Sequence, residues 1–186
     1  ILGQGYSQSL ELIKSVIPLS ILKFPSGTKC GSWTVPQEWI IRDAYISNLR
    51  GERVVDFRKN PFHVWQYSVP FSGTVSRAKL LEHIITVSAV PDAVPLKITY
   101  YNKNWGFSIS ARELEEIKDD FYLVHIDSDF RDGNLEVGEL YLKGNSEKEI
   151  IVDAVLSSPA LANNLSGVVV AAFLAEFRYA GYMVPS

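Results

Sequence analysis

Three histidines are the side chains best suited to hold a metal ion or to transfer a proton near neutral pH. They are His63, His83 and His125, and none lies within four residues of another. A metal site on one helix face needs two ligands one turn apart, as in the HExxH motif, and that spacing does not occur. We therefore expect structural or surface roles, with His83 at a partly buried helical position and His63 and His125 in strands.

The acidic stretch from Asp127 to Gly133 carries oxygen ligands of the kind that calcium prefers. Its spacing does not fit a calcium loop. With Asp127 as the first ligand, Asp132 takes the place of the required glycine and Gly138 that of the bidentate glutamate. The sequence Asp132-Gly133-Asn134 instead predicts a hairpin turn that joins two strands.

Aromatic side chains could line a binding groove. Because aromatic residues in short strands more often belong to a core, we expect a core role for most of them. The residues are Trp33, Trp39, Trp65, Tyr67, Tyr100, Tyr101 and Trp105.

The hydrophobic periodicity predicts alternating helices and strands, which would position these side chains. Ser110 and Glu113 form a capping-box pattern at the start of one short helix. We expect helices at residues 7–16, 76–85, 110–118 and 165–177. We expect strands at residues 19–24, 33–35, 40–46, 53–57, 63–69, 96–101, 105–109, 121–126, 135–143 and 149–156, with 96–101 and 105–109 paired around a turn.

The last third of the chain is the part most typical of an α/β enzyme. Residues 149–156 read as a strand covered on both faces, and residues 165–177 as a helix that is apolar nearly all round and therefore buried. Ligands in α/β folds bind beyond the carboxyl end of a strand. We therefore place the candidate site in the loop of residues 157–166, where Asn164 or Ser166 would cap the helix.

Composition narrows the class of protein. The chain has 186 residues, of which 47% are hydrophobic, and a net charge of −3 with no basic run. This balance argues against nucleic acid or an anionic membrane as partner. The longest apolar run, residues 167–175, is far shorter than the ~20 residues of a spanning helix, so we expect a soluble protein. A single cysteine, Cys30, excludes an internal disulfide and fits the cytoplasm.

Several segments share a pattern with one known family. They are residues 25–29, 33–39, 41–46, 63–70, 100–101 with 105–107, 126–128 with 132–133, and, most specifically, 161–169. Together they resemble the aminopeptidase-like zinc peptidases that carry an inserted domain of unknown function. The resemblance spans nearly the whole chain but only about the N-terminal half of such a protein.

The resemblance implies a zinc-exopeptidase-like (phosphorylase/hydrolase-like) α/β core of three layers, incomplete in this chain, with a small α+β inserted domain. Residues 1–46 would form the first part of the core, 47–129 the insertion, and 130–186 the remainder of the core with the site loop. Such enzymes remove N-terminal residues from short peptides. Two zinc ions about 3.5–4 Å apart activate a bridging water, and a glutamate acts as general base.

The chain departs from the family at the metal ligands. In an ungapped alignment Ala154 takes the position of a histidine ligand and Asn163 that of the bridging aspartate; in the alternative alignment the histidine position holds Val155 and the aspartate is deleted. Alanine and valine donate no lone pair, and asparagine supplies no negative charge. Asp153 is a nearby carboxylate, expected to be a turn or surface group. We therefore expect no intact catalytic, metal or cofactor-binding residue, and zinc is implied by the resemblance alone.

These observations predict an aminopeptidase-like protein that is catalytically degenerate or a fragment in this chain. One alternative is a non-catalytic module for peptide or carbohydrate binding or for assembly. Another is an incomplete sequence of an active zinc aminopeptidase. A peptide is the candidate ligand. We also expect a homo-oligomer or a partner chain, because the helix at 165–177 would lack part of the sheet that should cover it.

Overall fold

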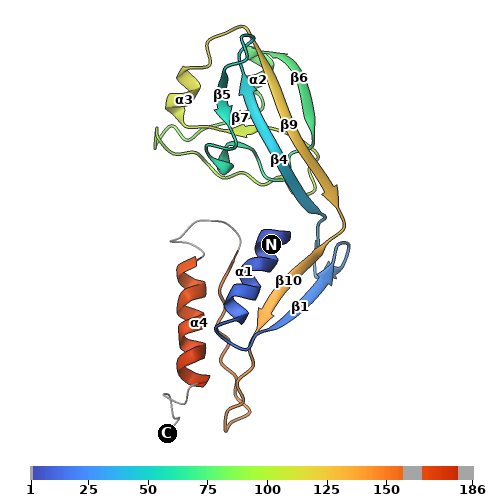
Figure 1. The fold of residues 1–186 in the computed structure, drawn as a ribbon, viewed down its shortest axis with the longest axis vertical. Helices are drawn as coiled ribbons and strands as arrows, with labels where there is room; N and C mark the ends of the chain where they lie inside the picture. Colours follow the sequence, from blue (N-terminus) through green and yellow to red (C-terminus); the bar gives the residue numbers. More distant parts are fainter. Residues whose placement is uncertain (1, 157–164, 180–186) are drawn as a thin grey trace. The chain divides into compact units, whose positions relative to one another are not determined.

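The computed structural model describes residues 2–156 and 165–179 (Figure 1). The chain has a mixed α/β fold with two compact units. Residues 39–131 form the continuous unit, and residues 2–38, 132–156 and 165–179 form the discontinuous unit, which combines segments from both sides of the continuous one in the sequence. None of the described helices is long and apolar enough to cross a membrane.

The continuous unit is built on a four-stranded sheet in the order β5-β4-β9-β6. The strands are β4 (Glu38–Ser47), β5 (Arg53–Asp56), β6 (Phe71–Ser76) and β9 (Phe121–Arg131). β6 runs antiparallel to β9, with Phe71 opposite Ile126 and Ser76 opposite Phe121. Along β9, Tyr122, Val124 and Ile126 are buried while Phe121 is exposed, which is the alternation of a sheet with one solvated face.

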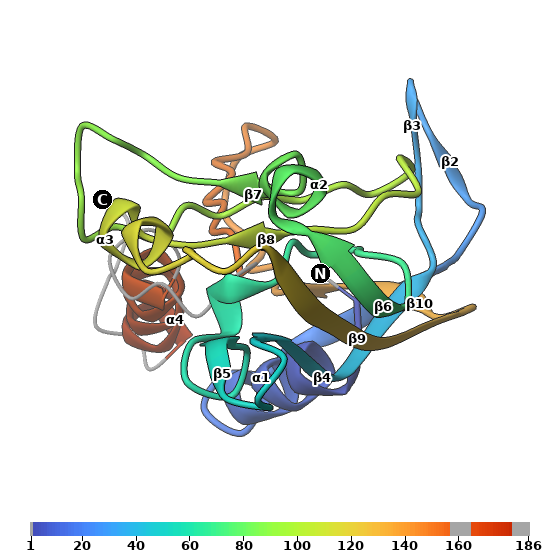
Figure 2. The same ribbon diagram turned by 90° about the horizontal axis from the view of Figure 1, so that it is seen from above.

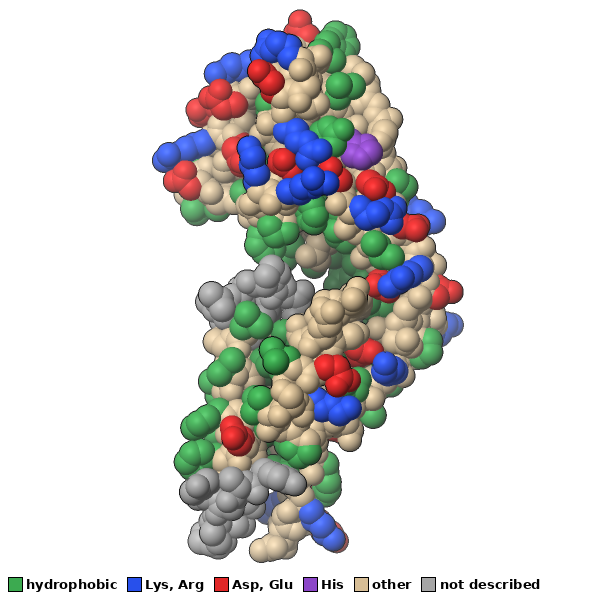
Figure 3. All heavy atoms as spheres, in the orientation of Figure 1, with side chains coloured by type: hydrophobic (Ala, Val, Ile, Leu, Met, Phe, Trp, Pro, Cys, Tyr) green, Lys and Arg blue, Asp and Glu red, His purple; other side chains and the backbone are tan. Residues whose placement is uncertain are grey.

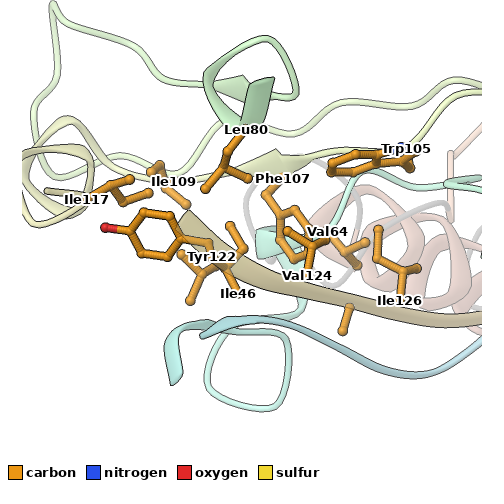
Figure 4. Packing of buried hydrophobic residues seen from close by; sticks show 12 residues of the cluster. Ile46, Val64, Leu80, Trp105, Phe107, Ile109, Ile117, Tyr122, Val124 and Ile126 are labelled. Carbon is orange, nitrogen blue, oxygen red and sulfur yellow. The ribbon is translucent and has the colours of Figure 1, made fainter. Parts of the chain in front are cut away.

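Short elements cover the buried face of this sheet. They are η1 (Pro61–His63), α2 (Arg77–Leu81), β7 (Ile84–Ile85), β8 (Phe107–Ser108) and α3 (Ala111–Glu115). Seen from above, β7, β8, α2 and α3 lie to one side of β4 and β9 (Figure 2). The core between them includes Leu80 from α2, Phe107 from β8 and Tyr122 from β9, all almost fully buried (Figure 4).

Helix α3 begins with the capping box expected from the sequence. The Glu113 N–H donates to Ser110 Oγ over 3.1 Å, and the Ser110 N–H donates to Glu113 Oε2 over 2.8 Å. Two of the otherwise unsatisfied N–H groups at this helix end are thereby paired.

The discontinuous unit contains α1 (Gln4–Lys14), the antiparallel pair β1 (Ser20–Pro25) and β10 (Asn134–Glu139), the small pair β2 (Lys29–Cys30) and β3 (Trp33–Thr34), and α4 (Ser166–Tyr179). α1 packs against the β1–β10 pair at Gly138. A Cβ added there would lie 3.2 Å from a methyl group of Leu10 and 3.0 Å from one of Leu19. Glycine is therefore what lets the helix approach the strand this closely.

Two expectations for the last third of the chain are wrong in the described residues. Residues 149–156 form no strand, and Ile150 is 93% exposed. The helix at 165–177 forms as α4, but it is not buried: Val169, Phe173 and their apolar neighbours face outward, and Figure 3 shows hydrophobic side chains on the surface of this part of the chain. A strand covered on both faces needs neighbouring strands and helices, and the described residues supply none here.

Other expectations fail because distant pairings override local patterns. Asp132-Gly133-Asn134 makes no hairpin, since β10 pairs with β1 and β9 with β4 and β6. Residues 63–69 contain the end of η1 and two isolated bridges rather than a strand. Residues 96–109 form no hairpin, because Ile98 bridges Gln66 and β8 pairs in parallel with β7. The helix expected at 76–85 ends at Leu81, after which Ile84 and Ile85 enter β7.

Candidate functional site

The site expected from the sequence falls only partly within the described residues. Asn163 and residues 157–162 lie outside them. Asp153 and Val155 are exposed in an irregular segment, and Ala154 lies near the start of α4, with its Cβ 3.8 Å from where a Cβ on Gly167 would stand. None of these described side chains is held by a neighbouring strand.

The described donor groups do not fit a metal centre. Residues 2–156 and 165–179 contain no group of three or more His, Cys, Asp or Glu side chains that could hold a metal ion. Ala154 and Val155 have no lone pair to offer, and Asp153 alone cannot satisfy a zinc ion, which takes four ligands. Among the described residues, the positions expected for ligands of the dinuclear zinc site therefore supply no more than the single carboxylate of Asp153.

The buried histidine, His63, has a structural role. Its Nδ1 lies 3.1 Å from the Asp56 carbonyl oxygen and its Nε2 lies 3.1 Å from Glu113 Oε1. Burial alone would raise the pKa of Glu113, but hydrogen bonds from Ser110 and the nearby His63 outweigh it and lower that pKa. The contact ties the segment before β6 to α3.

The other two histidines are separate from His63 and from each other. His83 stacks on Trp105, with 3.8 Å between ring centroids, and its Nδ1 lies 2.8 Å from the Trp105 carbonyl oxygen. His125 lies in β9, as expected, and its Nδ1 is 2.7 Å from Ser72 Oγ.

The Ser72–His125 contact has the chemistry of a nucleophile and its base. A carboxylate on the same strand, Asp127, accepts a hydrogen bond from Arg42 Nε over 2.9 Å instead, and this hydrogen bond lowers the Asp127 pKa. Ser72, His125 and Asp127 lie on the solvated face of the sheet. This arrangement indicates a surface polar network rather than a catalytic triad.

The continuous unit contains a cluster of aromatic rings whose contacts with one another could not be predicted from the sequence. We call Trp39, Tyr67, Tyr100, Tyr101 and Phe130 the aromatic cluster. Ring centroids are 6.2 Å apart for Trp39–Tyr67, 5.1 Å for Tyr67–Tyr100, 6.3 Å for Tyr67–Phe130 and 6.1 Å for Tyr100–Tyr101. The expectation of a core role is confirmed for Trp65, Tyr67 and Trp105, whereas Tyr101 is 57% exposed. The cluster thus runs from the interior to solvent.

Two members of this cluster have an unusual backbone. Tyr67 has φ 68° and Tyr100 has φ 42°, in the left-handed region that glycine or asparagine usually occupies. For a bulky residue this conformation costs about 1–2 kcal/mol, so the surrounding contacts must impose it. The Tyr100-Tyr101 doublet is visible in the sequence, but nothing in it signals left-handed tyrosines, and the expected hairpin placed the doublet wrongly.

The chain is similar to a family of unknown function and to proteins from Clostridium acetobutylicum. Residues 38–129 match the family model described as domain of unknown function DUF2172. A Clostridium acetobutylicum protein named "Putative polysaccharide biosynthesis protein with aminopeptidase-like domain" is 42% identical over 177 residues, which cover 95% of this chain and 41% of that protein. The crystal structure of a "putative peptidase" from Clostridium acetobutylicum superposes with a TM-score of 0.86 at 41% identity and covers 95% of this chain and 42% of that one. The chain thus spans about two fifths of the length of both relatives.

Proposed function

We propose that the chain is the aminopeptidase-like part of a zinc-peptidase-related protein and that it has no hydrolytic activity of its own. The observation that carries the proposal is similarity along 95% of the chain to a protein named for an aminopeptidase-like domain. The structural likeness to a crystal structure described as a peptidase supports it.

In this proposal residues 47–129 are a domain inserted into a three-layer, zinc-exopeptidase-like core. Residues 1–46 and 130–186 contribute to that core. Support comes from the chain path, because residues 2–38 and 132–179 form one unit while residues 39–131 form another. The family model for residues 38–129 also ends close to these points. The exact boundaries and the three-layer arrangement remain predictions.

Zinc chemistry is not assigned to this chain. By the family resemblance, the position of the histidine ligand holds Ala154 or Val155, and that of the bridging aspartate holds Asn163 or is deleted. These side chains cannot provide the anionic, electron-donating set that two divalent ions require. Asp153 is exposed and supplies one carboxylate at most.

The exposed apolar surface of the discontinuous unit supports the proposal that this unit binds a partner. Ile150, Ile151 and Val152 are each more than half exposed, as are Val169 and Phe173 on α4. Apolar surface is worth roughly 25 cal/mol per Å² when it is removed from water, so covering these side chains is strongly favourable. We propose that this surface packs against further polypeptide or a second copy of the chain. A cytoplasmic location, expected from the single cysteine, stays a prediction.

The test is calorimetric titration of the metal-stripped chain with Zn²⁺, followed by assay of the zinc-treated protein with amino-acid anilides. We expect no stoichiometric high-affinity binding and no hydrolysis above the metal-free control. Binding of two zinc ions per chain together with steady anilide turnover would contradict the proposal. That result would favour an active zinc aminopeptidase instead.

A second candidate is a non-catalytic binding module for peptide or carbohydrate. The Clostridium relative is named for polysaccharide biosynthesis, and the continuous unit of this chain carries an aromatic cluster that reaches solvent. This candidate predicts that a saccharide or a peptide raises the melting temperature of the chain without added metal. Indifference to both classes of ligand would count against it.

A further inference from the structure

We propose that the aromatic cluster of the continuous unit binds a neutral oligosaccharide, with the rings of Tyr100 and Tyr101 as the contact platform. This inference rests on the second candidate function, carbohydrate binding, and adds the place and the class of ligand. It does not depend on the aminopeptidase-like core, because all five residues belong to residues 39–131.

The platform is held in place by backbone contacts to a buried segment. The Thr99 N–H and its Oγ1 both donate to the Gln66 carbonyl oxygen over 3.0 Å, and the Gln66 N–H donates to the Lys97 carbonyl oxygen over 2.9 Å. The Asn102 N–H donates back to the Thr99 carbonyl oxygen, closing a turn around Tyr100 and Tyr101. The two tyrosines therefore project from an anchored turn.

The ring beneath the platform is equally fixed. Tyr67 is buried between Trp39, Tyr100 and Phe130. The Trp39 Nε1–H donates to the Ser68 carbonyl oxygen over 2.9 Å, and Ser128 Oγ donates to the same oxygen over 2.8 Å. Rings fixed before binding lose little conformational entropy when a ligand stacks on them.

The left-handed backbone of Tyr67 and Tyr100 indicates that these side-chain positions serve more than stability. A glycine at either position would relieve the strain, yet tyrosine stands at both. Strain of this kind concentrates where a protein orients groups for a ligand. Here it sets the two rings 5.1 Å apart, with the outer ring next to the exposed Tyr101.

The chemistry of the surface favours a sugar over other ligands of aromatic sites. A pyranose ring offers C–H groups to a ring face and hydroxyls to polar neighbours, and Asn102 and Lys103 are exposed on the same turn. A quaternary ammonium ligand would meet a lysine on this turn instead of a carboxylate.

The experiment measures binding of cellohexaose, maltohexaose and N-acetylchitohexaose to the whole chain by saturation-transfer NMR, with calorimetry for any saccharide that binds. We expect at least one of them to bind with a millimolar or lower dissociation constant. Tyr101→Ala should weaken that binding at least tenfold, whereas Tyr101→Phe, which keeps the ring, should weaken it less than threefold. Tyr141→Ala removes an exposed tyrosine of the discontinuous unit and should change nothing.

The outcomes separate the site from the function. If no saccharide binds at 10 mM, the proposal is overturned, and only peptide binding remains of the second candidate function. If a saccharide binds equally to the Tyr101→Ala variant, carbohydrate binding stands but this site is wrong. If only a decaproline peptide binds, and Tyr101→Ala abolishes that binding, the cluster is a peptide site and the saccharide assignment is refuted. The zinc and anilide experiments are unaffected by any of these results.

Discussion

The continuous unit buries most of its large apolar side chains, whereas the C-terminal part of the discontinuous unit leaves side chains of the same types exposed. In the continuous unit, twelve hydrophobic side chains form one cluster in which each is at most 8% exposed. In residues 149–156 and α4, apolar side chains of the same types face outward, with Phe173 58% exposed. Since the apolar residue types of the two regions are alike, residue type does not explain the difference in burial. The difference lies in the elements that cover each region.

This contrast teaches that hydrophobic sequence specifies burial only where the partner surfaces are supplied. The sheet β5-β4-β9-β6 meets its covering elements within residues 39–131. The described part of the discontinuous unit has a two-stranded pair, β1 and β10, and no larger sheet to receive α4. The continuous unit closes its own core, whereas the apolar surface of residues 149–156 and α4 stays exposed in the described part of the chain.

The largest effect should come from emptying the closed core. Phe107 is fully buried, so Phe107→Ala should lower the free energy of unfolding of the continuous unit by about 3–5 kcal/mol. Phe173→Ala, on the exposed surface of α4, should cost less than about 0.5 kcal/mol. Urea unfolding followed by circular dichroism measures both variants, since both units contribute helices and strands to the signal. Equal losses in the two variants would contradict the contrast.

A pair of glycines tests packing in the same way with a smaller effect. A Cβ at Gly106 would lie 2.6 Å from the His83 carbonyl oxygen and 2.6 Å from the Trp65 ring, so Gly106→Ala should destabilise by about 1–3 kcal/mol. Gly5 in α1 has no atom within 4 Å of its added Cβ, and Gly5→Ala should stabilise by about 0.5–1 kcal/mol. Thermal unfolding by circular dichroism should show melting temperatures that move in opposite directions. A rise for Gly106→Ala would mean that the core is looser than described.

A carboxylate in the discontinuous unit shows that its β1–β10 part is well formed. Glu136 is buried, and its pKa is lowered first by a hydrogen bond from Ser7 and then by Lys23, 2.9 Å away. Because the pKa is lower in the folded state, Glu136 stabilises the fold above the ordinary glutamate pKa of about 4.3. That stability is lost as the pH falls through the lowered value.

Glu136→Gln should therefore destabilise the discontinuous unit by about 1 kcal/mol at pH 7 and remove part of its stability loss between pH 5 and pH 3. Glu139→Gln, an exposed neighbour in β10 for which no such contact is described, is the matched control. Circular dichroism at a series of pH values measures both variants. An unchanged acid transition in Glu136→Gln would show that this carboxylate is not engaged.

The smallest stability effect is expected on the uncovered apolar surface. Ile150→Ser and Val169→Ser each replace a highly exposed side chain, so the free energy of unfolding should change by less than about 0.5 kcal/mol. Self-association should weaken measurably, because this surface is the proposed contact. Light scattering over a range of concentrations compares the variants with Tyr141→Ser, which removes an exposed aromatic ring from the same unit. A monomeric wild-type chain at high concentration would contradict packing of this surface against a second copy of the chain.

The local sequence predicts those parts of the fold that depend on nearby residues. The capping box of Ser110 and Glu113 and the helix α4 need only neighbours along the chain, and both form. The strand around Val124 also forms, and its alternating pattern matches a sheet with one buried face. The pairing of β1 with β10 joins residues more than a hundred positions apart, so the Asp132-Gly133-Asn134 turn could not reveal it. Parallel pairing of β7 with β8 likewise overrode the expected helix and hairpin.

The two candidate sites also differ in how far the sequence predicts them. The absence of metal donors at Ala154 and Val155 can be read from residue type alone, because no fold gives those side chains a lone pair. The aromatic cluster could not be assembled in advance. Trp39, Tyr67 and Phe130 meet only through tertiary packing, and left-handed tyrosines have no sequence signal.

Native-state hydrogen exchange on the 186-residue chain tests the central contrast most directly, because it reports both regions in one sample. We predict that the amides of Val124 and Ile126, in the middle of the four-stranded sheet, exchange only on global unfolding of the continuous unit. The amides of Ile150, Ile151 and Val152 should exchange close to their intrinsic rates. Protection of residues 150–152 equal to that of β9 in the monomeric chain would contradict the account, because it would mean that this region is covered by its own unit.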